Sequence, residues 1–195
     1  MKTVRWEIPL KAEMVRKLEV GDIIYLNGLV YTARDMAHLK MRTIISEGGM
    51  LPVNLEGGVL FHAGPVVKKR DEGWEMVVVG PTTSMRMEPF AKLVAEIGVK
   101  LIIGKGGMGE YSQQTFVDHG MAYLQAAPGC AVKLAQSVEK VLGVTWPELG
   151  MAEAMWAFEV RNFGPFVVAM DAAGRSLYRE ITETAQKKIT DWFPL

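Results

Sequence analysis

Three cations on three predicted loops are the side chains in this sequence best placed to do chemistry: Arg34, Arg86 and Lys105, with the hydroxyls of Thr82, Thr83 and Ser84 close to Arg86 in the sequence. Each lies just after a short apolar run that predicts a strand and shortly before a segment that predicts a helix. In an open α/β sheet, ligands bind beyond the carboxyl ends of the strands, so we expect these loops to meet at one edge. Three cations gathered in a chain with no excess positive charge indicate a small polyanion, such as a dicarboxylate, with phosphate as the alternative.

The loop from Gly80 to Arg86 has two interpretations. Its two threonines and its serine stand at a predicted helix start, where they could cap the helix and leave Arg86 on the surface. Free N–H groups and the helix dipole at the same place also favour an anion, which Arg86 could hold through two parallel hydrogen bonds. The sequence leaves both interpretations open.

The glycine-rich segment Gly104–Gly109 surrounds Lys105 and also has two interpretations. Its glycines permit a positive φ and a close backbone approach, as in a phosphate-binding loop. Lys105 precedes most of these glycines, however, so the segment does not match the Walker pattern, and it follows a late strand rather than an opening one. The alternatives are a tight turn with an exposed lysine and a small-anion or nucleotide-binding module.

Other titratable residues carry weaker signals. Asp35 and His38 are three residues apart on a predicted helix, where they could form either a structural cap or an acid–base pair. Cys130 has no histidine near it in the sequence, and His62 and His119 are isolated, so we expect these three in structural positions.

Composition limits the classes of protein that this chain can belong to. It has 195 residues, 22 Lys+Arg against 22 Asp+Glu, 49% hydrophobic residues and one cysteine. This length predicts one domain spanning residues 1–195. The single cysteine excludes a disulfide framework and any metal site held by thiolates of this chain alone. The charge balance argues against nucleic-acid and membrane-surface binding, and no signal peptide or membrane span is evident, so we expect a cytoplasmic protein.

Short β-rich runs alternate with helical patterns, which predicts an α/β fold with a mixed sheet and flanking helices. The predicted strands are Ile23–Leu26, Val30–Thr32, Val59–His62, Met76–Val79, Leu101–Ile103, Met121–Gln125, Trp156–Val160 and Phe166–Met170. The predicted helices are Arg34–Ser46, Glu88–Ile97, Gln114–His119, Val132–Leu142 and Ser176–Thr190.

Two local arrangements follow from this pattern. We expect the strand at 76–79, the helix at 88–97 and the strand at 101–103 to form a right-handed parallel βαβ unit. The early strands should be joined by tight glycine turns at Asn27-Gly28 and Gly57-Gly58.

Several segments resemble the β region of class I fumarate hydratases and L-tartrate dehydratases. They are Leu18–Gly28, Tyr31–His38, Gly80–Met87, Ile102–Gly106 and Glu153–Trp156, and they follow the same order and spacing from about residue 10 to 180. The Gly-Pro-Thr-Thr and Gly-Lys-Gly signatures are specific in combination, although neither would be specific alone.

This resemblance implies a single swivelling β/β/α-type domain and a separate β subunit that is active only with an α subunit. The partner would carry a [4Fe–4S] cluster on three cysteines, in a hetero-oligomer. The implied reaction is the reversible hydration of fumarate to L-malate, or the dehydration of tartrate to oxaloacetate, with the open iron as Lewis acid.

The resemblance also implies roles for individual residues. Arg34, Arg86 and Lys105 match the ligands of the substrate carboxylates, and Thr82 matches the residue proposed as catalytic base. A hydroxyl is a poor base unless nearby cations lower its pKa, so His38 or a group of the partner is an alternative proton carrier. A purely structural subunit is the competing interpretation from another class.

Overall fold

The computed structural model describes residues 1–71 and 73–192, without the side chains of residues 190 and 191. Its main sheet has the strand order β1-β2-β3-β6-β7-β9-β8, and β2 also pairs with β9, so that β2, β3, β6, β7 and β9 close into a barrel. A separate two-stranded sheet is formed by β4 and β5. The mixed α/β architecture expected from the sequence is confirmed.

The bounds of the elements are as follows. The strands are β1 Thr3–Glu7, β2 Ile23–Thr32, β3 Val59–Phe61, β4 Val66–Arg70, β5 Gly73–Val78, β6 Leu101–Gly104, β7 Ala122–Gln125, β8 Val138–Thr145 and β9 Met155–Met170. The α-helices are α1 Ala12–Val15, α2 Asp35–Ser46, α3 Ala91–Glu96, α4 Glu110–His119, α5 Ala131–Ala135 and α6 Leu177–Trp192. Two 3₁₀ segments complete the elements, η1 Ser84–Phe90 and η2 Pro147–Leu149.

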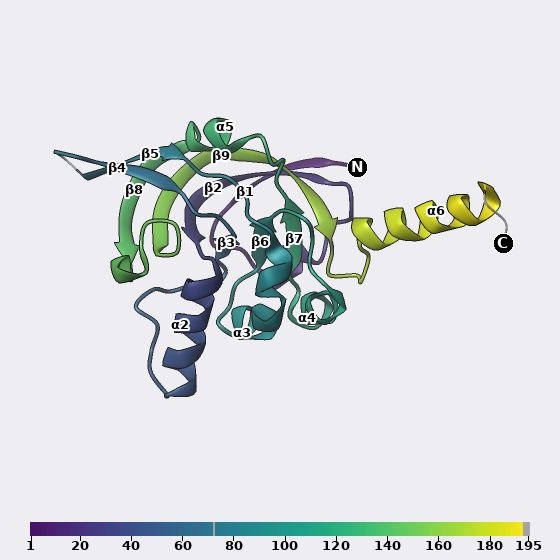
Figure 1. Cartoon of the computed structure of the whole chain (residues 1–195), viewed down its shortest axis with the longest axis horizontal. Coiled ribbons are helices and arrows are strands. Elements are labelled where there is room, and N and C mark those ends of the chain that lie inside the picture. The colour runs from purple at the N-terminus through teal and green to yellow at the C-terminus, as the bar shows by residue number, and fades with distance from the viewer. Residues whose placement is uncertain (72, 193–195) are drawn as a thin grey trace.

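Helices α2, α3 and α4 cover one side of the barrel, α5 lies on the opposite side, and α6 projects away from the body (Figure 1). The described helices include none that is long and apolar enough to span a membrane.

Aromatic rings fill the barrel. Phe163 packs edge-on against Phe166, with ring centroids 5.0 Å apart, and against Phe61 at 5.7 Å. A second buried cluster lies between the barrel and helices α2, α3 and α4 and includes Met41, Met87 and Phe116. The two clusters fix the position of the helices on the barrel, because the side chains of a close-packed interior leave little room to shift.

Four neighbouring strands of the barrel, β2, β3, β6 and β7, run parallel to one another. Their carboxyl ends therefore lie at one edge, and α2 and α4 begin just beyond two of them. This is the edge at which the sequence predicted a ligand site.

The predicted turn at Asn27-Gly28 is wrong. The chain passes through this dipeptide as part of the single strand β2, with register shifts against β9 on both sides of Leu26. Gly28 has a φ of +102°, and a Cβ there would lie 3.1 Å from the carbonyl oxygen of Ile8. The glycine therefore permits an irregular strand and a close backbone contact instead of a reversal. The two predicted strands at 156–160 and 166–170 are likewise one strand, β9.

The predicted βαβ unit is also wrong. Strand β5 pairs antiparallel with β4 in the small sheet, so it is not a neighbour of β6. Strand β4 was not predicted, because its Lys68-Lys69-Arg70 run does not resemble a buried strand. Without this partner, the strand at 76–79 was expected in the main sheet. Strand β1 and helix α1 were not predicted either.

The predicted helix Val132–Leu142 is correct only in its first part. Helix α5 ends at Ala135, and residues 138–145 form β8, which pairs antiparallel with β9. The long edge of β9 provides hydrogen bonds for this segment, and such pairing overrides a weak local preference for helix. The predicted helices at 34–46 and 176–190 are confirmed as α2 and α6, and the turn around Gly57 is also present.

Candidate functional site

The segment that carries Thr82 lies between the ends of β3 and β6. Its amide N–H donates to the carbonyl oxygen of His62 at 2.7 Å, and the Lys105 N–H donates to the Thr82 carbonyl at 3.2 Å. Thr83 and Lys105 form a parallel bridge, and the Ser84 N–H donates to the Lys105 carbonyl at 3.0 Å. The threonine loop and the lysine loop are therefore joined backbone to backbone.

Arg86 connects this segment to helix α2. Its Nη2 donates to the Thr82 hydroxyl at 3.1 Å, while Nε and Nη2 donate to the two carboxylate oxygens of Asp35 at 3.0 and 2.9 Å. Partial burial would raise the pKa of Asp35, but the hydrogen bonds of Arg86 and the charges of Arg86 and Arg34 outweigh that effect and lower it. The guanidinium therefore approaches the Thr82 oxygen in a fixed orientation.

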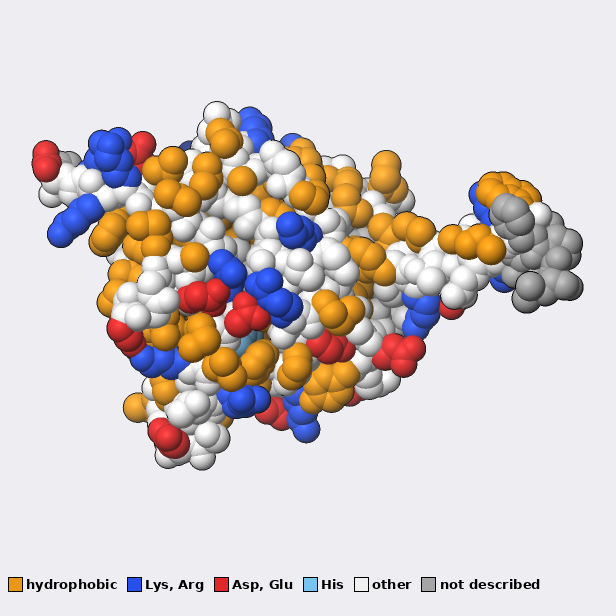
Figure 2. Space-filling model, viewed as in Figure 1, with side chains coloured by type: hydrophobic (Ala, Val, Ile, Leu, Met, Phe, Trp, Pro, Cys, Tyr) orange, Lys and Arg blue, Asp and Glu red, His pale blue; other side chains and the backbone are white. Residues whose placement is uncertain are grey.

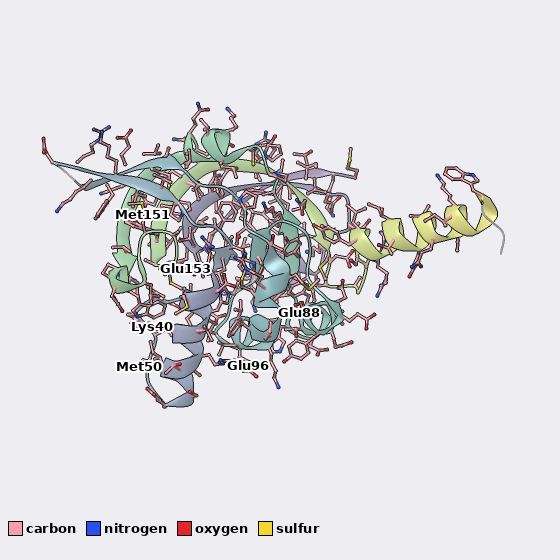
Figure 3. The ribbon with its side chains drawn as sticks, in the orientation of Figure 1. Lys40, Met50, Glu88, Glu96, Met151 and Glu153 are labelled. Carbon is pink, nitrogen blue, oxygen red and sulfur yellow. The ribbon has the colours of Figure 1, made fainter. Side chains whose placement is uncertain are left out.

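Arg34 lies one residue before α2 and is held by Glu153, the residue labelled beside the first turn of α2 in Figure 3. Arg34 Nη2 lies 3.1 Å from one Glu153 oxygen, and the Met36 N–H donates to the other at 3.0 Å. Gly64 leaves room for this arginine, because a Cβ there would lie 2.7 Å from Arg34 Nη1. Arg34 Nε is buried and has no acceptor among the residues that the structure describes.

Lys105 differs from the two arginines. Among the side chains that the structure describes, no carboxylate pairs with its ammonium group. Basic and acidic side chains gather together in the middle of the face shown in Figure 2. The structure thus brings Thr82 and Arg86 into direct contact, joins Lys105 to the same segment, and places Arg34 beside Asp35. Two of the three cations already have a carboxylate partner, and the third is available to a ligand.

A buried polar chain lies beneath Thr82. His62 Nδ1 is 2.9 Å from the Ser84 hydroxyl, which also accepts a hydrogen bond from Tyr123 at 3.0 Å. His38 lies beside His62, with ring centroids 5.2 Å apart, and its Nδ1 contacts the carbonyl of Arg34 at 2.8 Å. Burial lowers the pKa of His38 to about 4 and lowers that of His62 well below its usual value, where the charges of His38 and Arg86 add to the effect. Both rings are therefore neutral at pH 7, and they lie buried beneath the segment that carries Thr82.

Gly104 makes this polar chain possible. A Cβ at this position would lie 1.8 Å from Ser84 Oγ and 2.9 Å from the Tyr123 hydroxyl oxygen. The first glycine of the Gly-Lys-Gly signature is therefore required by the close approach of two buried hydroxyls.

Asp35 and His38 do not form the acid–base pair that the sequence allowed. Asp35 pairs with Arg86, and the His38 ring faces the Arg34 carbonyl. The backbone N–H groups at the start of α4 are already used by Glu88, whose oxygens accept from Gly109 N at 2.7 Å and Ser112 N at 3.0 Å. An internal carboxylate thus occupies the place where a phosphate would bind, which disfavours the nucleotide-binding interpretation.

Sequence reasoning missed the roles of Glu153, Ser84 and Tyr123. Glu153 belongs to one of the segments that carry the family resemblance, but it lies 119 positions beyond Arg34 in the numbering, so no local spacing joins the two. His62 was expected in a structural position, and its contacts agree with that expectation.

The residues of this chain do not fit an iron–sulfur cluster, which requires several thiolates. Cys130 is the single cysteine, its Sγ contacts the carbonyl of Ala127, and burial raises the pKa of its thiol. The described residues also contain no group of three or more His, Cys, Asp and Glu side chains that could hold a metal ion.

Comparisons with known proteins identify the family of this chain. The family model described as "Fumarase C-terminus" matches residues 1–181. The chain is 47% identical over 182 residues to a putative L(+)-tartrate dehydratase subunit beta of Methanocaldococcus jannaschii, covering 91% of this chain and 92% of the relative. It is 44% identical over 173 residues to the L(+)-tartrate dehydratase subunit beta of Escherichia coli K12, covering 88% and 85%. It is also 37% identical over 193 residues to a putative fumarate hydratase class I of Geobacillus stearothermophilus, covering 98% of this chain but 36% of that protein.

Proposed function

Because this chain belongs to the fumarase C-terminus family, we propose that it is the β subunit of a two-subunit hydro-lyase that adds water to, or removes water from, a four-carbon dicarboxylate. The observation that carries this proposal is the contact between the Arg86 guanidinium and the Thr82 hydroxyl at 3.1 Å, on a segment bonded to Lys105. A hydroxyl next to several cations suits a reaction that moves a proton beside a carboxylate.

In this proposal the cations bind the substrate. Lys105 has no carboxylate partner among the described side chains, and Arg34 and Arg86 retain N–H groups beyond those that Glu153 and Asp35 accept. A dicarboxylate would therefore meet fixed positive charge at both ends. Charge-assisted hydrogen bonds to carboxylates are about twice as strong as neutral ones, and they orient the substrate as well as hold it.

Thr82 holds or accepts the proton that enters or leaves a carbon next to a carboxylate. Its Oγ1 accepts a hydrogen bond from Arg86, which stabilises negative charge on that oxygen and so favours its action as a base. We assign His62 and His38 a structural role, because their rings contact the Ser84 hydroxyl and the Arg34 carbonyl, and because burial lowers their pKa values and so makes them weak bases.

The family resemblance also predicts a [4Fe–4S] cluster. Since this chain has one cysteine, we propose that the cluster belongs to an α subunit that closes the other side of the site. That arrangement makes the isolated β subunit inactive and the complex a hetero-oligomer.

Fumarate hydration and L-tartrate dehydration both need this set of cations. The 47% and 44% identities to tartrate dehydratase subunits, against 37% to the fumarate hydratase, favour tartrate as a second candidate substrate. Kinetic constants for malate and for L-tartrate, measured on the same preparation, distinguish the two substrates.

The test is anaerobic reconstitution with a cluster-bearing α subunit. We expect dehydration of malate or tartrate only in the mixture and none with either subunit alone. A mixture that forms a stable complex but turns over neither substrate would contradict the proposed reaction. A purely structural role would be indicated instead if the α subunit alone had the activity of the mixture.

A further inference from the structure

Helix α6 lies mostly outside the body of the molecule (Figures 1 and 2). Its first turn packs on the second core cluster through Leu177 and Tyr178. Beyond that turn, Ile181, Ile189 and Trp192 are 59%, 57% and 72% exposed. A helix of this length has marginal stability in water without tertiary contacts, so these side chains require a partner surface.

From Tyr178 onward, the apolar and aromatic residues of α6 are arranged symmetrically about Ala185. Ile181 and Ile189 lie four residues to either side of it, and the aromatic residues Tyr178 and Trp192 lie seven to either side. Offsets of four and seven residues return to the same face of a helix, so these side chains form one stripe. A stripe with the same order in both directions is complementary to a second copy of itself running antiparallel.

We propose that α6 pairs antiparallel with α6 of a second copy of this chain, with the two-fold axis at Ala185. Each Ile181 then faces Ile189 of the second copy, and the small Ala185 side chains allow the helices to approach closely. Such a contact is isologous, so every interaction occurs twice. An unrelated partner protein would require no match between the two halves of the helix.

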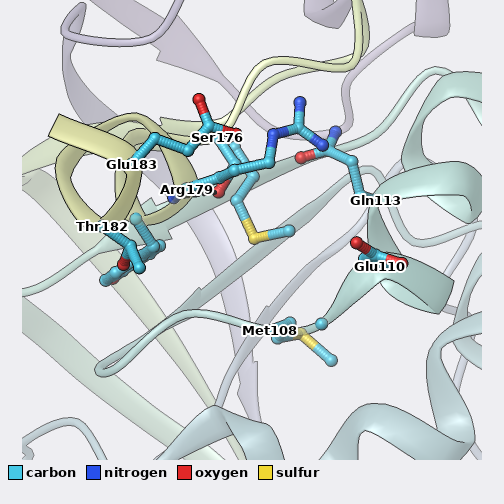
Figure 4. Close-up of a pocket in the computed structure, with 10 residues that line it drawn as sticks. Met108, Glu110, Gln113, Ser176, Arg179, Thr182 and Glu183 are labelled. Carbon is cyan, nitrogen blue, oxygen red and sulfur yellow. Dashed lines mark hydrogen bonds between the residues drawn. The ribbon is translucent and has the colours of Figure 1, made fainter. Parts of the chain in front are cut away.

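A cavity at the base of α6 fits the tip of a second helix. It measures about 240 Å³ and is lined by Met108, Met170, Tyr178, Arg179 and Thr182, among others (Figure 4). The two-fold pairing brings Trp192 of the second copy beside Tyr178, at the mouth of this cavity. An exposed indole at one end of the helix and a largely apolar hollow at the other complement each other.

Cysteine cross-linking of the full chain tests the pairing. In a Cys130→Ser background, we expect Ala185→Cys to form a covalent dimer on mild oxidation, because the two thiols meet at the axis. Lys187→Cys is the matched control, because position 187 lies on the opposite side of the helix and should not cross-link. Equal cross-linking at both positions, or none at 185 in a sample that is dimeric by sedimentation, would overturn the proposal.

A second measurement does not depend on a new thiol. The double variant Ile181→Lys, Ile189→Lys should sediment at half the mass of the wild-type chain, and Trp192→Ala should weaken dimerisation at least tenfold. Circular dichroism checks that the barrel remains folded in each variant. The proposal is overturned if the double variant stays dimeric, or if adding the α subunit shields the thiol introduced at position 185 and abolishes its cross-link. The latter result would assign the helix to the α subunit.

Discussion

Arg86 and Asp35 form a two-point contact, with Nε and Nη2 of the arginine 3.0 and 2.9 Å from the two carboxylate oxygens. The same Nη2 lies 3.1 Å from the Thr82 hydroxyl. A residue at the start of α2 therefore determines how a guanidinium from η1 approaches the candidate base. The contact joins two segments 51 positions apart in the numbering and makes their relative placement part of the site.

Replacing Asp35 should misplace Arg86. We expect Asp35→Ala to lower kcat about 10- to 100-fold in the reconstituted enzyme, because small displacements of a positioning group weaken the reaction by such factors. Asp35→Asn should retain more activity, since its amide oxygen can still accept one hydrogen bond. Both residues are part-exposed, so the loss of folding stability should stay within about 1 kcal/mol.

Removal of another exposed ion pair is the control for this experiment. Lys92→Gln breaks a pair with Glu96 at 3.8 Å on α3 and should leave kcat unchanged. If Asp35→Ala lowers KM and leaves kcat intact, Asp35 instead competes with the substrate for Arg86, and its positioning role is wrong.

Lys105 should contribute to substrate binding rather than to folding. Lys105→Ala removes a charge-assisted hydrogen bond, which is worth about 1.5–3 kcal/mol, so KM should rise about 10- to 100-fold. Lys68→Ala, at an exposed lysine of β4, is the matched control and should leave KM unchanged. Steady-state kinetics at saturating α subunit measure both variants. An unchanged KM for Lys105→Ala would remove this lysine from the substrate site.

Gly104 should tolerate no side chain. The Cβ of Gly104→Ala would overlap Ser84 Oγ at 1.8 Å, so we expect a loss of about 1–3 kcal/mol in the free energy of unfolding by urea. Gly143→Ala is the control, because a Cβ there meets nothing within 4 Å. Equal stability of the two variants would show that Ser84 and Tyr123 can move aside without cost.

The stability of the protein should fall between pH 6.5 and pH 4. Burial lowers the folded-state pKa of His38 to about 4 from its usual 6.5, so in this range the unfolded chain binds a proton that the folded chain does not. The free energy of unfolding then decreases with falling pH, by up to about 1.4 kcal/mol per pH unit for each such histidine, and is constant above the range. His62 acts in the same direction.

Urea titrations at several pH values measure this slope. His38→Gln should reduce it, because the substituted residue takes up no proton on unfolding. The same slope in the variant and the wild-type chain would show that His38 is accessible to protons in the folded state.

Local patterns predicted the parts of this fold that depend on local forces. Helix α2 has apolar residues at helical spacing, and Gly48-Gly49 follow just after its end, so both signals are local in the sequence. Residues 138–142 of β8 were predicted as helix because their conformation depends on the edge of β9, which no local pattern reveals. The turn predicted at Gly28 is wrong for a similar reason, since that glycine is needed for a close contact with Ile8, just after β1 and far away in the sequence.

In the candidate site, too, features set by local sequence patterns were predictable, and contacts between distant segments were not. The loops after predicted strands indicated that Arg34, Arg86 and Lys105 would share an edge. For Arg86 the reason was wrong, because the strand before it, β5, lies in the small sheet; backbone bonds between Thr82 and Lys105 join its segment to the lysine loop instead. The carboxylates that hold the arginines were not predictable as partners. Glu153 reaches Arg34 only because β9 returns across the barrel to β2, a relation that exists in the folded chain alone.

The most direct test of the proposed chemistry compares Thr82→Ser with Thr82→Ala in the anaerobic complex with the α subunit. We expect Thr82→Ser, which keeps the hydroxyl bound to Arg86, to retain most of kcat. We expect Thr82→Ala to lower kcat about 100-fold or more, the usual contribution of a general base, while assembling normally. A kcat for Thr82→Ala equal to that of the wild-type complex would contradict the role of Thr82 as base.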